Sequence, residues 1–94
     1  MDKMEHIRGK LLQDEAVLLE EVDGYLNCHD HKGKKSFYGY FELVMDQSKL
    51  LIPGTCYRLL LKDGRKCNIY TEVVPSNAPG KAVAEFHVAG GFKK

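Results

Sequence analysis

The densest group of reactive side chains in the sequence is the run Cys28, His29, Asp30 and His31. On a β-strand, residues two apart project from the same face, so His29 and His31 would lie side by side. Imidazole nitrogens are common zinc ligands, and such a pair supplies half of a tetrahedral site. A complete site needs further ligands, and the sequence spacing selects none. We therefore expect solvated histidines near a strand end, with no metal site and no cofactor.

The three cysteines, Cys28, Cys56 and Cys67, could act as nucleophiles if a histidine base lay beside one of them. No glycine-rich elbow or other catalytic signature surrounds them, so we expect a binding protein and not an enzyme. The odd number of cysteines and an N-terminus without a secretory apolar stretch predict a reduced, cytoplasmic protein. The apolar runs are far shorter than the about 20 residues of a transmembrane helix, which predicts no membrane span.

A second pattern with chemical meaning combines aromatic and basic side chains. Strands over residues 22 to 31 and 36 to 45 would each place tyrosine or histidine on the face opposite to the apolar one. A hairpin joining these strands brings the aromatic side chains onto one solvent-exposed face, with lysines at the turn. The candidate binding residues are Tyr25, His29, His31, Lys32, Lys34, Lys35, Tyr38 and Tyr40.

This composition fits two kinds of partner. Tyrosine is enriched at protein interfaces, which favours a homo-oligomer or a protein partner. Exposed aromatic rings beside lysines can also stack bases and neutralise phosphates, so nucleic-acid or nucleotide binding is the alternative. The net charge of +1 conceals an asymmetry: residues 1 to 30 hold three basic and eight acidic residues, and residues 31 to 94 hold eleven basic and five acidic residues. Such a distribution suits self-association or an acidic partner.

The strands themselves follow from alternation of apolar and polar residues. Along residues 36 to 46, the odd positions from Phe37 to Met45 form the predicted core face. Around Asp63 and Gly64, a two-residue turn would mix apolar and polar side chains on both faces of a hairpin. A three-residue loop over residues 62 to 64 instead pairs Tyr57 with Ile69 and gives one apolar face, so we prefer it. A last strand covers residues 82 to 88, followed by a fraying tail.

The N-terminal third permits two interpretations. Two strands, over residues 7 to 11 and 16 to 19, could flank a polar turn, and we prefer this interpretation. The apolar residues of residues 10 to 22 also recur at helical spacing, so an N-terminal helix in an α+β fold is the alternative.

Length and composition limit the fold to something small. The chain has 94 residues and 44% hydrophobic residues, which predicts one domain over residues 1–94 with a thin core. An open sheet of this size would leave one face and two edges exposed, whereas closure removes both problems. We therefore predict an all-β fold: a small closed or rolled antiparallel barrel of five to six strands.

In their rhythm of strands and turns, residues 39 to 43 and 53 to 65 resemble small bacterial β-barrel domains, including PilZ-like barrels. The resemblance implies a β-barrel. PilZ domains that bind cyclic dinucleotides carry an arginine-rich N-terminal stretch and an Asp-x-Ser-x-x-Gly motif. Here that stretch holds only Arg8, and Asp46-Gln47-Ser48 is followed by Lys49-Leu50-Leu51 without the glycine. Dinucleotide binding is therefore not implied.

Overall fold

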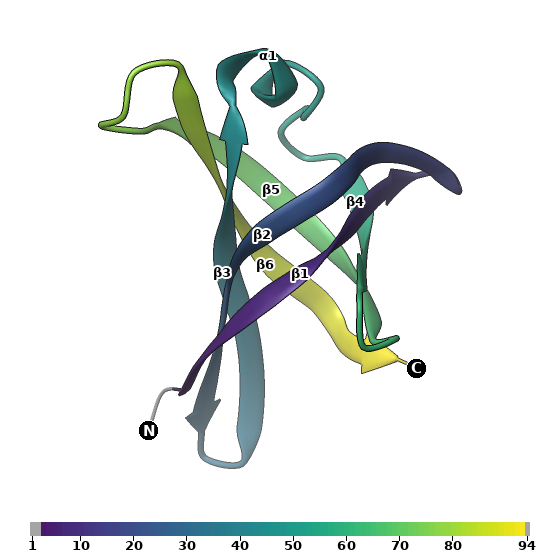
Figure 1. Ribbon diagram of the computed structural model, residues 1–94. Helices are drawn as coiled ribbons and strands as arrows, with labels where there is room; N and C mark the ends of the chain where they lie inside the picture. Colours follow the sequence, from purple (N-terminus) through teal and green to yellow (C-terminus); the bar gives the residue numbers. More distant parts are fainter. Residues whose placement is uncertain (1–2, 94) are drawn as a thin grey trace.

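The computed structural model describes residues 3–93, which form a closed antiparallel barrel of six strands, as predicted (Figure 1). The order around the barrel is β1-β2-β3-β6-β5-β4, and pairing of β1 with β4 closes it. None of the helical structure in the described range has the length and apolar character of a membrane span. The elements are β1 (Lys3–Gln13), β2 (Ala16–His31), β3 (Lys34–Val44), α1 (Met45–Ser48), β4 (Cys56–Leu61), β5 (Lys66–Pro75) and β6 (Lys81–Lys93).

The N-terminal third consists of two strands, so the helical alternative over residues 10 to 22 is wrong. β1 and β2 pair along most of their length, and Asp14 and Glu15 form the turn with positive φ angles of 51° and 71°. Register shifts interrupt the pairing on either side of Leu11. These irregularities break the strict alternation of a strand, which is why the spacing of the leucines also matched a helix.

The β4–β5 hairpin has the predicted register. Tyr57 lies opposite Ile69, and Leu59 lies opposite Cys67. Gly64 closes the loop with a φ of 98° and donates its N–H to the carbonyl oxygen of Leu61 at 3.0 Å. A left-handed residue at this position is what a three-residue hairpin loop requires, and glycine adopts it without a steric penalty.

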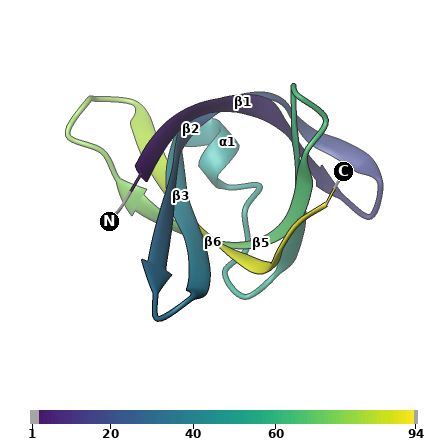
Figure 2. The ribbon, with the colours of Figure 1, turned by 90° about the horizontal axis from the view of Figure 1, so that it is seen from below.

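One end of the barrel is covered by α1 and the segment that follows it (Figure 2). The buried Leu51 packs into the core, and the Tyr57 hydroxyl holds the segment by accepting the N–H of Ile52 at 2.7 Å. The prediction that Met45 continues the core face of its strand is wrong, because the strand ends at Val44 and Met45 begins α1, where its side chain is 42% exposed.

The opposite end is covered by the C-terminal part of β6. The expectation of a fraying tail is wrong over the described residues, since β6 continues to Lys93. The Phe92 ring meets Phe37 edge to face, with 5.1 Å between centroids, and the Arg65 guanidinium lies 5.4 Å from the centre of the Phe92 ring. Arg65 also bonds Glu5 on β1 at 2.5 Å. Packing and a cation–π contact therefore tie β6 to the rest of the barrel.

Two strand glycines allow the close approach of β2 and β3. A Cβ atom on Gly24 would lie 2.0 Å from the carbonyl oxygen of Tyr40, and one on Gly39 would lie 2.0 Å from that of Tyr25. The space beside Gly24 is instead taken by the buried Phe41, which lies opposite it in the register. Glycine is thus required here for backbone contact and not for turn geometry.

We expect Gly24→Ala to lower the free energy of unfolding by at least about 3 kcal/mol, because the new methyl group would overlap fixed backbone. Urea denaturation followed by tyrosine fluorescence measures the change. The control is Gly33→Asn, since Gly33 has open space around it and asparagine tolerates its positive φ of 81°. Equal stability of the two variants would contradict the assignment.

Candidate functional site

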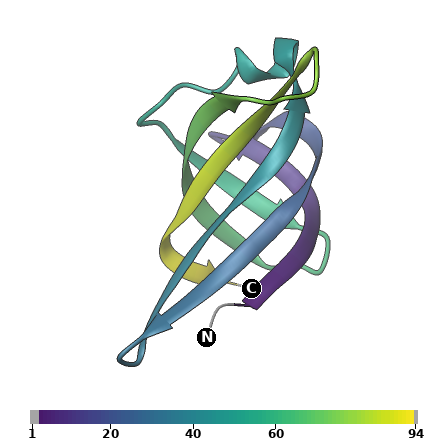
Figure 3. The same cartoon turned by 90° about the vertical axis from the view of Figure 1, so that its left-hand side faces the viewer.

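The tyrosine face, which we define as Tyr25, Tyr38 and Tyr40, lies on the outside of β2 and β3, on the side of the barrel seen in Figure 3. Tyr25 and Tyr40 lie directly opposite each other, with 5.7 Å between ring centroids. Tyr38 lies two register pairs further along, on the same face, and is 41% exposed. The predicted grouping of the three tyrosines on one outer face is present in the structure.

Three further aromatic side chains border this face. The His6 ring on β1 lies 5.3 Å from the ring of Tyr25. On the other side, His87 on β6 lies opposite Tyr38 and stacks on Tyr70 of β5, with 5.5 Å between centroids. Alternation along single strands does not reveal these partners, because their positions depend on which distant strands pair with β2, β3 and β5.

The β2–β3 hairpin projects beyond the barrel (Figure 1). Among the described residues, β1 pairs with β2 only as far as Cys28, and β6 pairs with β3 only from Tyr38 onward. Within residues 3–93, the remainder of β2 and β3 pairs only as a hairpin, and we call residues 29 to 36 the basic tip. The imidazole rings of His29 and His31 stack within it at 6.2 Å.

The basic tip does not present all its lysines to the tyrosine face. Lys34 lies opposite His31, on the same side of the ribbon as the tyrosine face. Lys32 forms the turn with a φ of 53°. Lys35 lies opposite Asp30 in the alternate set of positions, which points to the other face of the ribbon. The prediction that Lys35 shares a face with the aromatic residues is therefore wrong, because closeness to the turn does not determine on which face of the strand a side chain lies.

The opposite end of the tyrosine face is acidic. Asp23 lies opposite Glu42, and both side chains are exposed. His6 bonds the Asp23 carboxylate, and Arg8 bonds it at 3.2 Å. The hydrogen bond from His6, together with the nearby charges, holds the pKa of Asp23 below its ordinary value.

The three candidate thiols lie in different environments. Burial raises the pKa of the Cys67 thiol to about 12, so this thiol is protonated and unreactive at neutral pH. Cys28 is half-buried and Cys56 is exposed, and both are free. In residues 3–93, no group of three histidine, cysteine or acidic side chains is placed to hold a metal ion.

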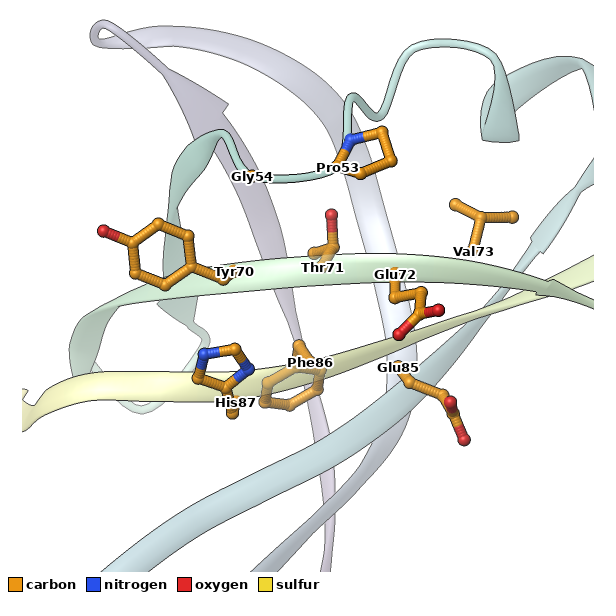
Figure 4. Close-up of a pocket in the computed structure, with 9 residues that line it drawn as sticks. All are labelled: Pro53, Gly54, Tyr70, Thr71, Glu72, Val73, Glu85, Phe86 and His87. Carbon is orange, nitrogen blue, oxygen red and sulfur yellow. The ribbon is translucent and has the colours of Figure 1, made fainter.

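A groove of about 720 Å³ lies beside the tyrosine face, between the Pro53–Gly54 loop and strands β5 and β6 (Figure 4). Glu72 on β5 lies directly opposite Glu85 on β6. Thr71 is only 5% exposed, and its hydroxyl oxygen has no hydrogen-bond partner within the described residues. Figure 4 shows that hydroxyl pointing from β5 toward the loop. The groove is lined by Pro53, Gly54, Tyr70, Thr71, Glu72, Val73, Glu85, Phe86 and His87.

We expect Thr71→Val to raise the free energy of unfolding by about 1 kcal/mol, because the substitution replaces a buried, unpaired hydroxyl with a methyl group of similar size. Urea denaturation of the variant beside the parent protein tests this. A loss of stability would mean that the hydroxyl has a partner in solution.

No protein-family model, no curated protein and no solved structure matches this chain.

Proposed function

We propose that this protein is a self-associating binding module in which the tyrosine face pairs with the same face of a second copy. The proposal is supported by the distribution of charge on either side of the Asn27–Tyr38 pair. His31 and Lys34 form a basic pair at the tip, and at the other end Glu42 lies opposite Asp23, whose carboxylate is ion-paired with Arg8.

The two charged pairs lie at equal distances from the centre. Lys34 and Glu42 are each four residues from Tyr38 along β3, which is about 13 Å in an extended strand. A two-fold axis through Tyr38 would therefore place Lys34 of each copy over Glu42 of the other. An interface of this kind uses the same patch twice and must be self-complementary, and this face meets that requirement.

Aromatic side chains occupy the middle of the same surface. Under the two-fold arrangement, the Tyr25–Tyr40 pair of one copy lies over His29 and Ser36 of the other, since these pairs are also symmetric about Tyr38. Tyrosine contributes a large apolar area with few rotatable bonds, so it is well suited to a small interface. The nine-pair ribbon gives an interface at the small end of the usual range, and we expect micromolar affinity.

We expect Lys34→Glu and Glu42→Lys to weaken self-association by at least about tenfold each, because each change turns two attractions into repulsions. The double variant should regain the parent affinity, since both contacts then join opposite charges again. Lys34 and Glu42 are far apart within one chain, so rescue can arise only between chains. Sedimentation equilibrium up to high micromolar concentration measures the dimer constant.

Tyr38→Ala should also weaken the dimer, because Tyr38 lies at the proposed axis and is removed from both copies. Ile52→Ala is the matched control, since Ile52 is 58% exposed and lies at the capped end of the barrel. A parent protein that stays monomeric at high micromolar concentration, or charge reversals that fail to rescue, would overturn the proposal.

Nucleic-acid binding is a second candidate, supported by the projecting basic tip and its stacked histidines. Asp23, Glu42 and Glu85 share the outer surface with the tyrosines and would repel phosphates, which disfavours it. We expect no binding of a fluorescent single-stranded oligonucleotide at physiological salt. Binding that weakens steeply with salt, and is lost when Lys32, Lys34 and Lys35 become alanine, would favour this candidate over self-association.

A further inference from the structure

We propose that the protein binds an extended segment of a partner polypeptide, which adds as a strand to an open edge of β5 in the groove beside the Pro53–Gly54 loop. Strand addition to a sheet edge is a recurring mode of peptide recognition. Backbone hydrogen bonds supply the affinity, and alternate side chains supply the specificity. The edge of β5 is separate from the tyrosine face, and the proposal does not depend on self-association.

The first observation is that β5 extends beyond its partner β4. The β4–β5 ladder ends where Cys56 lies opposite Tyr70, whereas β5 continues to Pro75. On its other side, β5 stays paired with β6 as far as Pro75 opposite Ala82. Residues 71 to 74 are therefore held extended by β6, and in the described part of the chain no strand pairs with their other edge. Such an edge presents unpaired N–H and C=O groups to an incoming strand.

The second observation concerns the loop that covers this edge. Pro53 and Gly54 form the wall of the groove that faces β5 (Figure 4). Within residues 3–93, no backbone hydrogen bond joins this loop to residues 71 to 74. The Thr71 hydroxyl points toward the loop, is buried and has no partner among the described residues either. The loop thus covers part of β5 without supplying hydrogen bonds to it, and polar groups left unpaired in this way cost stability.

The loop can move away from β5 without uncovering the core. The groove has a volume of about 720 Å³, which is within the range of ligand sites. Gly54 has a φ of 82° and open space around it. The chain before the loop is anchored, because the N–H of Ile52 donates to the Tyr57 hydroxyl at 2.7 Å. A shift of Pro53 and Gly54 therefore opens the edge while Leu51 stays in the core.

The side chains along this edge define the partner. Alternate residues of an added strand point to opposite faces of the sheet. On the outer face they meet Glu72, which lies opposite Glu85 on β6, so a basic side chain fits there. On the other face they meet Thr71 and Val73, which point toward the loop in Figure 4, so a β-branched apolar side chain fits. The expected segment therefore alternates basic and apolar residues.

The edges of the basic tip are poorer acceptors for such a strand. Lys32, Lys34 and Lys35 are exposed there, and lysine is a residue that opposes strand addition at an edge. A basic segment would also be repelled by these side chains. The edge of β5 carries no lysine or arginine from residue 71 to residue 74, and it lies in a groove.

The test uses three capped peptides. The first is acetyl-Val-Arg-Val-Arg-Val-amide. The second is the same peptide methylated on the backbone nitrogens of its three central residues, which keeps the charge and removes the N–H donors. The third has glutamate in place of both arginines.

Calorimetry and amide chemical-shift mapping should show that the first peptide binds, with shifts at residues 71 to 74. The methylated and glutamate peptides should each bind at least about tenfold more weakly. Equal binding of either control peptide, or no binding of the first peptide at millimolar concentration, would overturn the proposal. Shifts confined to residues 29 to 36 would overturn it as well, because the strand would then add to the basic tip.

A charge reversal tests the direction of the outer side chains. Glu72→Lys should weaken binding of the arginine peptide and strengthen binding of the glutamate peptide, by at least about threefold each. The variant should fold at least as stably as the parent, because lysine opposite Glu85 replaces a like-charge pair. Glu20→Lys, at an exposed position on β2, is the matched control and should leave both affinities unchanged. Affinities that stay the same in Glu72→Lys, or that change in the same direction, would refute the site.

A last variant keeps this proposal apart from self-association. Tyr38→Ala changes the tyrosine face on β3 and should leave binding of the arginine peptide unchanged. Loss of peptide binding in that variant would show that the edge of β5 is not a separate site.

Discussion

Closure of the sheet is the constraint on which the rest of this structure depends. The ladder from Gly9 opposite Leu61 to Leu12 opposite Arg58 joins strands that are distant in the sequence. It pairs edges that would otherwise be open, and it lets a short chain enclose Leu11, Leu59 and Ile69 on all sides. Once the barrel is closed, each strand has one inner and one outer set of side chains. The tyrosine face belongs to the outer sets of β2 and β3, whereas the groove is lined by both outer and inner residues of β5 and β6.

Closure of the sheet leaves the two ends of the barrel open to water, so other segments of the chain must cover the core there. At one end, the hydroxyl of Tyr57 holds the segment that carries Leu51 over the core. At the other end, Arg65 joins Glu5 on β1 to the ring of Phe92 on β6. At each end an apolar side chain covers the core, and a polar contact holds the covering segment in place. The core is therefore shielded from water at both ends.

Alternation along single strands allowed much of the fold to be predicted. The β4–β5 register followed from Tyr57 and Ile69, because the competing register had no apolar face. The short α1 was not predicted, since Met45 continues the alternation of the strand before it. Gly90 and Gly91 resembled a loose tail, although both lie within β6 with φ angles of 81° and 90°. Local pattern alone does not show that Phe92 packs against Phe37.

The candidate sites also differ in how far they could be predicted from the sequence. The contact between Tyr25 and Tyr40 lies within one hairpin and could be predicted from local spacing. The opposition of Glu72 and Glu85 depends on the pairing of β5 with β6 in one register, and Thr71 resembles any inward-facing strand residue until its surroundings are known.

The projecting β2–β3 ribbon has a consequence for solubility. From Asp30 to Ser36 both of its edges present backbone groups that no neighbouring strand pairs within the described residues. Edges of this kind recruit strands from other molecules, and lysine opposes that addition because its charge would have to be desolvated. Lys32, Lys34 and Lys35 therefore oppose the addition of strands from other molecules to this edge. Neutralising them, for example by acetylation, would make this hairpin more prone to edge-to-edge aggregation.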